Sequence, residues 1–119
     1  MSSSAYIVEA VRTAGGRRNG KLAAWHPADL AGEVLNAVIE RSKIDPATVE
    51  DVILGCVTQA GEQSFAFARN AVLASNLPET VPAVTIDRQC GSSQQAVNSP
   101  LRRLCPGRKI SLSQAVPKA

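Results

Sequence analysis

Apolar positions along the chain follow two kinds of pattern that alternate with one another. Short runs rich in β-branched residues, typical of strands, occupy residues 5–11, 49–57 and 81–86. Helical spacing or composition marks residues 26–43, 65–74 and 91–97. Strand therefore alternates with helix three times, β-α-β-α-β-α. This order predicts an α/β fold with parallel strands joined by right-handed crossovers.

The alternation stops after Val97. Residues 98–108 contain two prolines and a glycine, and no stretch up to Ala119 keeps a period of a helix or a strand. Residues 1–97 carry eight Arg and Lys against ten Asp and Glu, a net −2, whereas residues 98–119 carry five and no acid, a net +5. We predict a folded domain over 1–97, whose last helix Pro100 prevents from continuing. We predict an unrelated basic tail over 98–119, unpatterned and either disordered or translated from a shifted frame.

The composition excludes several classes of protein. A chain of 119 residues suits one domain, and 45% hydrophobic residues with 3% aromatic ones leave the core to Ala, Val, Ile and Leu. The net charge of +3 comes from the tail alone, so no nucleic-acid partner is expected. No apolar run is long enough to span a membrane and no signal sequence opens the chain. We predict a cytoplasmic protein without a membrane partner.

Three cysteines are the candidates for chemistry. They form no CxxC pair, so neither a metal site nor a disulfide framework is expected. Cys56 lies in an apolar run and is interpreted as a small core residue, and Cys105 as an exposed, oxidation-prone thiol in the tail. Cys90 follows the third predicted strand at the predicted start of a helix, where free amides favour thiolate and could stabilise an oxyanion. From position alone, Cys90 is either a nucleophile or a buried, inert cysteine.

Two further features, a basic cluster and the single histidine, are better explained by structural roles than by catalysis or binding. Arg12, Arg17, Arg18 and Lys21 surround Gly15-Gly16 and could grip a phosphate, but the Walker spacing is absent. We expect a solvated loop there. His26, the one histidine in the sequence, precedes a proline at the predicted start of a helix. It is interpreted as part of that helix start rather than as a catalytic base.

The segment Asp87-Arg88-Gln89-Cys90-Gly91-Ser92-Ser93, continued by Gln94-Gln95-Ala96, closely resembles the nucleophile segment of the thiolases, the acetyl-CoA acyltransferases. Residues 6–13 and 52–59 are similar to the opening and second strands of that family. The resemblance is collinear from about Ala5 to Val97. It implies a truncated thiolase-like N-terminal domain.

The resemblance also implies roles for particular residues. Cys90 would be the nucleophile, taking an acyl group from an acyl-CoA and exchanging it with coenzyme A or acetyl-CoA. Coenzyme A and acetyl-CoA would be substrates, and no bound cofactor is expected. Gly91 would contact the substrate. Arg69 lies in the helix that helps to build the dimer interface in this family of homo-oligomers, whose members act in lipid metabolism and fatty acid degradation.

Two catalytic segments of the family do not occur in these 119 residues. One is a Gly-His-Pro segment whose histidine activates the nucleophile, and the other carries a second cysteine that moves the α-proton of acetyl-CoA. The family's coenzyme A-binding loop domain does not occur here either. A cysteine without a base is on the order of a few per cent thiolate near neutral pH. We therefore expect a catalytically incomplete acyltransferase fragment, inactive or nearly so; the alternatives are a non-catalytic dimerising or binding module, or a non-functional remnant that aggregates.

Overall fold

Three parallel strands form the centre of the fold in the computed structural model, which describes residues 5–102 and 110–111. The middle strand is β1 (Val52–Gly55), with β2 (Ala83–Ile86) along one edge and β3 (Ile110–Ser111) along the other. Both neighbours run parallel to β1. The prediction of an α/β fold with parallel strands is confirmed.

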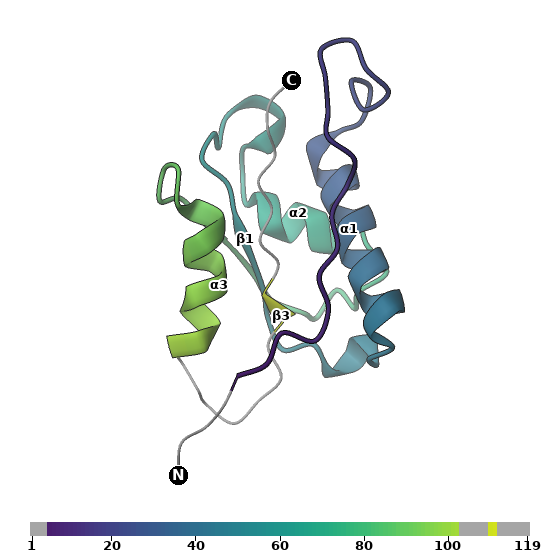
Figure 1. Ribbon diagram of the computed structural model, residues 1–119, viewed down its shortest axis with the longest axis vertical. Helices are drawn as coiled ribbons and strands as arrows, with labels where there is room; N and C mark the ends of the chain where they lie inside the picture. The colour runs from purple at the N-terminus through teal and green to yellow at the C-terminus, as the bar shows by residue number, and fades with distance from the viewer. Residues whose placement is uncertain (1–4, 103–109, 112–119) are drawn as a thin grey trace.

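Helices cover both faces of this sheet. Figure 1 shows α3 (Ser92–Arg102) on one side of β1, and α1 (Pro27–Ser42) and α2 (Phe67–Leu73) on the other. α2 packs on β1 and β2, α1 packs on α2, and α3 packs on β1 and β2. Two short 3₁₀ turns complete the described elements: η1 (Pro46–Thr48) and η2 (Gly61–Gln63).

β1 is buried along its whole length because it has helices on both faces. Val52 and Leu54 belong to the core shared with α1 and α2. The alternation of side chains along a strand turns Ile53 and Gly55 toward α3. The largest fully buried side chains are Phe67, Leu35, Leu54, Val52 and Val72.

The sequence around α1 explains where this helix begins and ends. His26 caps the start: its Nδ1 accepts a hydrogen bond from the Ala28 amide at 3.3 Å, and Pro27 occupies the first turn. Lys43 ends the helix with a left-handed φ of 55°, and its amide donates to the Ile39 carbonyl. The interpretation of His26 as part of a helix start is confirmed.

The predicted first strand, residues 5–11, is wrong. This segment forms no strand, and its side chains Tyr6, Ile7 and Val8 are exposed. Figure 1 shows it running beside α1 instead, where the Glu9 carboxylate meets the Arg41 guanidinium at 3.3 Å. β2 pairs with β1 along its whole length and β3 pairs with it at Val52 and Ile53, and residues 5–11 pair with none of these strands. Strand-like composition alone does not make a strand without a paired edge.

The predicted end of the last helix is also wrong. α3 continues past Val97 and through Pro100 to Arg102. Most helical stability in a protein comes from packing, and α3 packs along two strands with Ala96 fully buried, which outweighs the proline. Within the predicted tail, β3 adds two residues beside β1. The rest of that tail, residues 103–109 and 112–119, lies outside the described residues, and its predicted independence of the domain stays a prediction.

Candidate active site

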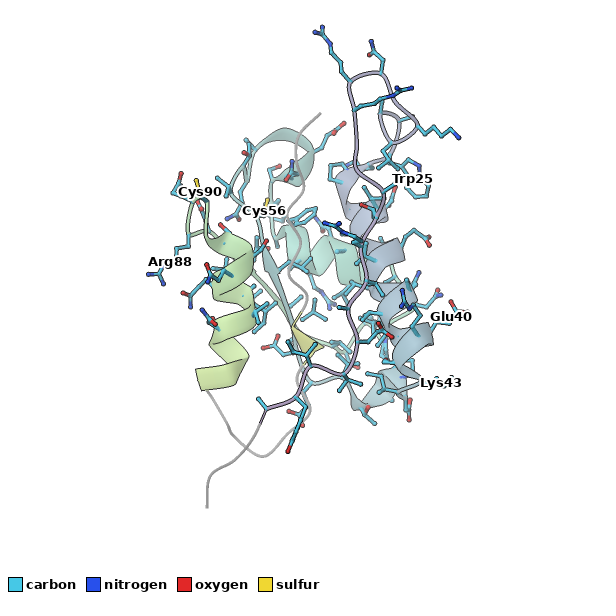
Figure 2. All side chains as sticks on the ribbon, in the orientation of Figure 1. Trp25, Glu40, Lys43, Cys56, Arg88 and Cys90 are labelled. Carbon is cyan, nitrogen blue, oxygen red and sulfur yellow. The ribbon has the colours of Figure 1, made fainter. Side chains whose placement is uncertain are left out.

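The candidate nucleophile lies where the parallel strands end. Cys56 directly follows β1 and Asp87 directly follows β2, and the Cys56 amide donates to the Ile86 carbonyl at 2.9 Å, which holds the two strand ends together. Figure 2 shows Cys56 and Cys90 at this same end of the molecule. The carboxyl ends of parallel strands are the usual place for ligands in open α/β sheets.

Cys90 sits in the tight turn that connects β2 to α3. It is exposed, as access to a substrate requires. The turn closes through two backbone bonds: the Gly91 amide donates to the Arg88 carbonyl at 3.0 Å, and the Ser92 amide donates to the Gln89 carbonyl at 3.2 Å. Gln89 has a φ of 46°, in the left-handed region that residues with side chains rarely occupy. Strained backbone of this kind is concentrated at functional sites.

Side chains on both sides of Cys90 hold this turn. Ser92 Oγ accepts a hydrogen bond from the Arg88 amide at 2.9 Å and donates one to the Gln89 carbonyl at 2.8 Å. Asp87 Oδ1 accepts a hydrogen bond from the Gln89 amide at 2.9 Å. The Arg88 guanidinium also bonds to the Gln95 side chain of α3. The turn is thus tied to the helix that follows it.

A glycine lets α3 begin close to the sheet. A Cβ on Gly55 would lie 2.4 Å from the carbonyl carbon of Ser92 and 2.4 Å from the amide nitrogen of Ser93. Those atoms are backbone, so no side-chain movement could make room. The absence of a side chain at Gly55 therefore fixes how near the start of α3, and with it the Cys90 turn, lies to β1.

The start of α3 offers free hydrogen-bond donors beside Cys90. In the described part of the chain, the amides of Ser93 and Gln94 have no acceptor, as is usual for the first turn of a helix. Together with the positive end of the helix dipole, they favour negative charge in this place. The arrangement is suited to stabilising a thiolate or an oxyanion.

The second described cysteine, Cys56, has a different environment. It is 5% exposed and lies in the core, and its thiol donates to Gln63 Oε1 at 3.2 Å. Burial raises the pKa of the Cys56 thiol, the Asp87 carboxylate raises it further, and a hydrogen bond with the Thr58 backbone opposes both. Cys56 therefore stays protonated near neutral pH. Its interpretation as a small core residue is confirmed.

The other predicted candidates lie away from Cys90 or outside the description. The His26 side chain caps the start of α1, where its Nδ1 accepts a hydrogen bond from the Ala28 amide. Arg12, Arg17, Arg18 and Lys21 are exposed in the loop before that helix. Cys105 lies outside the described residues. Among the residues that are described, no cluster of His, Cys, Asp and Glu could hold a metal ion, and no helix is long and apolar enough to cross a membrane.

A groove of about 260 Å³ lies elsewhere, against α1. Its lining includes Glu40, which Figure 2 shows on the opposite side of the molecule from Cys90. It is lined by Asn36, Ile39, Glu40, Pro46, Asn76 and Leu77, a set without a nucleophile. The groove is therefore not part of the Cys90 site.

Sequence reasoning did not identify two residues that shape the site. Gly55 could have been found, because a glycine inside an apolar strand signals close approach of another backbone. The buried amide of Gln63 had no such signal, because its burial against Cys56 depends on how the loop after β1 folds back.

The fold and the site together define an α/β domain that presents an exposed cysteine at a strand-to-helix junction. The thiolase N-terminal domain family matches residues 5–110 of the sequence. The chain belongs to the thiolase family. The matched region extends past Val97, the predicted domain boundary, which itself stays a prediction.

Individual relatives support the same assignment. A steroid 3-ketoacyl-CoA thiolase of Mycobacterium tuberculosis is 52% identical over 96 residues, covering 81% of this chain and 24% of the relative. A beta-ketoadipyl-CoA thiolase of Pseudomonas knackmussii is 43% identical over 108 residues, covering 90% of this chain and 27% of the relative. The crystal structure of an acetyl-CoA acetyltransferase of Bacillus anthracis matches with a TM-score of 0.62 and 39% identity, over 69% of this chain and 21% of that one. The chain spans about a quarter of the length of these relatives.

Proposed function

We propose that this chain carries the acyl-accepting half of a thiolase site, with Cys90 as the nucleophile. The Cys90 sulfur attacks the thioester carbonyl of an acyl-CoA, a new carbon–sulfur bond forms at Cys90, and the bond to the coenzyme A sulfur breaks. The proton of the Cys90 thiol leaves to solvent, and the departing coenzyme A thiolate takes one up. The observation that carries the proposal is the exposed Cys90 beside the free amides of α3.

The proposed acyl donor is an acyl-CoA thioester such as acetyl-CoA, with coenzyme A as the released product and no bound cofactor. The relatives named above support this class, since their names specify ketoacyl-CoA and acetyl-CoA compounds. Gly91 is the proposed substrate contact. The nearest atom to a Cβ at Gly91 would be the Arg88 carbonyl oxygen at 3.6 Å, so the fold itself does not require a glycine there. Access to Cys90 is the proposed reason for the missing side chain.

Turnover by these 119 residues is expected to be very slow. His26, the one histidine, is bound to the Ala28 amide at the start of α1, and α1 and α2 lie across the sheet from α3. No imidazole of this chain is therefore placed to take the proton of Cys90 or to return it to the leaving thiol. Stoichiometric acylation is the measurable step, because it needs only the cysteine and the donors around it.

Intact-mass spectrometry after incubation with acetyl-CoA tests the proposal. We expect one acetyl group per chain, located at Cys90 by peptide mapping and removed by hydroxylamine. Cys90→Ala should abolish the adduct, and Cys105→Ser is the matched control that should retain it. An adduct that persists in Cys90→Ala, or no adduct on the parent chain, would contradict the proposal.

The exposed Phe65 supports a second candidate function, association with another copy as a dimerising module. Its side chain is 91% exposed, and the backbone holds it at a φ of 58° in the loop before α2. Light scattering on the purified chain tests this candidate. A dimer that Phe65→Ser converts to a monomer would support it, and a monomeric parent chain would refute it.

A further inference from the structure

The turn that carries Cys90 is held by hydrogen bonds to the hydroxyl of Ser92, the first residue of α3. Ser92 Oγ bonds to the Arg88 amide and to the Gln89 carbonyl, at 2.9 and 2.8 Å, so one side chain holds both residues that precede Cys90. Ser92 is 3% exposed, so water has little access to replace these bonds. Within the described part of the chain, the Ser92 hydroxyl bonds to two residues of the turn before it, which is the placement of a positioning residue.

The backbone conformation of Gln89 explains why the turn needs these stabilising hydrogen bonds. Its φ of 46° is unfavourable for a residue with a side chain and persists only where the surroundings enforce it. The Ser92 hydroxyl binds the Gln89 carbonyl, and Asp87 Oδ1 binds the Gln89 amide at 2.9 Å. Side chains from both ends of the turn therefore hold the same strained residue, the one immediately before Cys90.

We infer that Ser92 and Asp87 are positioning residues that keep Cys90 at the start of α3; this rests on the proposed role of Cys90 as nucleophile. Without these bonds, Gln89 relaxes toward the favoured backbone region and carries Cys90 away from the free amides of Ser93 and Gln94. Those amides stabilise the negative charge on sulfur during attack. Loss of the hydrogen bonds made by Ser92 Oγ or by Asp87 Oδ1 should therefore slow any reaction in which the Cys90 sulfur attacks an electrophile.

The first test compares Ser92→Ala with Ser75→Ala in the full chain. Ser75 is a matched control because its hydroxyl also makes two turn bonds, donating to the Val72 carbonyl at 2.7 Å and accepting from the Leu77 amide at 3.2 Å. The readouts are the iodoacetamide alkylation rate of Cys90, measured by mass spectrometry, and amide exchange at Arg88. Both are taken under conditions where circular dichroism shows the variants to be folded.

We expect Ser92→Ala to lower the Cys90 alkylation rate by about threefold or more, since small displacements of a reacting group have large effects on rate. Exchange of the Arg88 amide should quicken in the same variant. Ser75→Ala should match the parent chain in both readouts. A purely structural role for Ser92 would lower stability without changing the alkylation rate of the folded protein, and that result overturns the inference.

A second pair of variants, at Asp87, tests the positioning role even if Ser92→Ala does not fold. Asp87 is exposed, so its variants should fold. Asp87→Ala and Asp87→Asn both remove the negative charge, but only alanine removes the acceptor of the Gln89 amide. Alkylation should be slower in Asp87→Ala than in Asp87→Asn, and equal rates overturn the inference.

Acylation by acetyl-CoA separates this inference from the proposed function. If the parent chain accepts no acetyl group, the proposed function fails, and the alkylation pairs still decide the positioning roles. If the parent chain is acylated and Ser92→Ala is acylated at the same rate, the positioning role fails while the proposed function stands.

Discussion

Replacing Gly55 by alanine would place a methyl group inside the contact between β1 and α3. Its Cβ would lie 2.4 Å from backbone atoms of Ser92 and Ser93, whereas ordinary contact begins at 3.4 Å. The start of α3 must therefore move outward by about 1 Å. Because both atoms are backbone, no rotamer change relieves the clash.

This substitution should lower the free energy of unfolding by about 1–2 kcal/mol. Overpacking of a core contact costs about 1–3 kcal/mol. Alanine recovers about 0.4–1 kcal/mol of this because it restricts the unfolded chain more than glycine does. The displaced start of α3 should also move the turn that carries Cys90, so the alkylation rate of Cys90 should change in the folded variant.

Urea unfolding followed by circular dichroism measures the loss of stability. The matched control is Gly15→Ala, where the added Cβ would have no atom within 4 Å and no positive φ is involved. That variant should stay within about 0.5 kcal/mol of the parent chain. If Gly55→Ala proves as stable as Gly15→Ala, the close approach of α3 to β1 does not constrain the protein and the reasoning is refuted.

Three further predictions test the core, the buried thiol and the substrate contact. Phe67→Ala should cost about 3–5 kcal/mol in urea unfolding because its side chain is 1% exposed, whereas Tyr6→Ala, at 83% exposed, should cost less than about 0.5 kcal/mol; similar losses would contradict the assigned core. Burial raises the pKa of the Cys56 thiol above its ordinary value, so the folded state keeps this proton to higher pH than the unfolded chain does. The free energy of unfolding should therefore fall as pH rises above the pKa of Cys56 in the unfolded chain, by at most about 1.4 kcal/mol per pH unit. If the free energy of unfolding depends on pH in the same way in the parent chain and in Cys56→Ala, this prediction is refuted. Gly91→Ala should keep its melting temperature but slow the acylation of Cys90 by acetyl-CoA, and unchanged acylation would remove Gly91 from the proposed substrate contacts.

Several elements of this protein follow from local sequence pattern alone. The apolar spacing after His26 predicts α1, and the cap and proline that begin it are adjacent in sequence. The apolar runs around β1 and β2 predict buried parallel strands, which the helices on both faces require. The placement of Cys90 between a strand and a helix also follows from local signals, because Gly91 and the polar residues after it mark the start of α3.

Which of the local tendencies become structure depends on packing between segments that are distant in sequence. Residues 5–11 have the composition of a strand, but strand formation depends on a free edge, and the neighbours of β1 are distant in sequence. Pro100 is a local helix breaker, but packing of α3 on the sheet carries the helix past it. The fit of Gly55 against Ser92 likewise joins residues far apart along the chain. Sequence patterns report what a segment prefers, whereas the partners that satisfy its hydrogen bonds and bury its side chains are set by the fold as a whole.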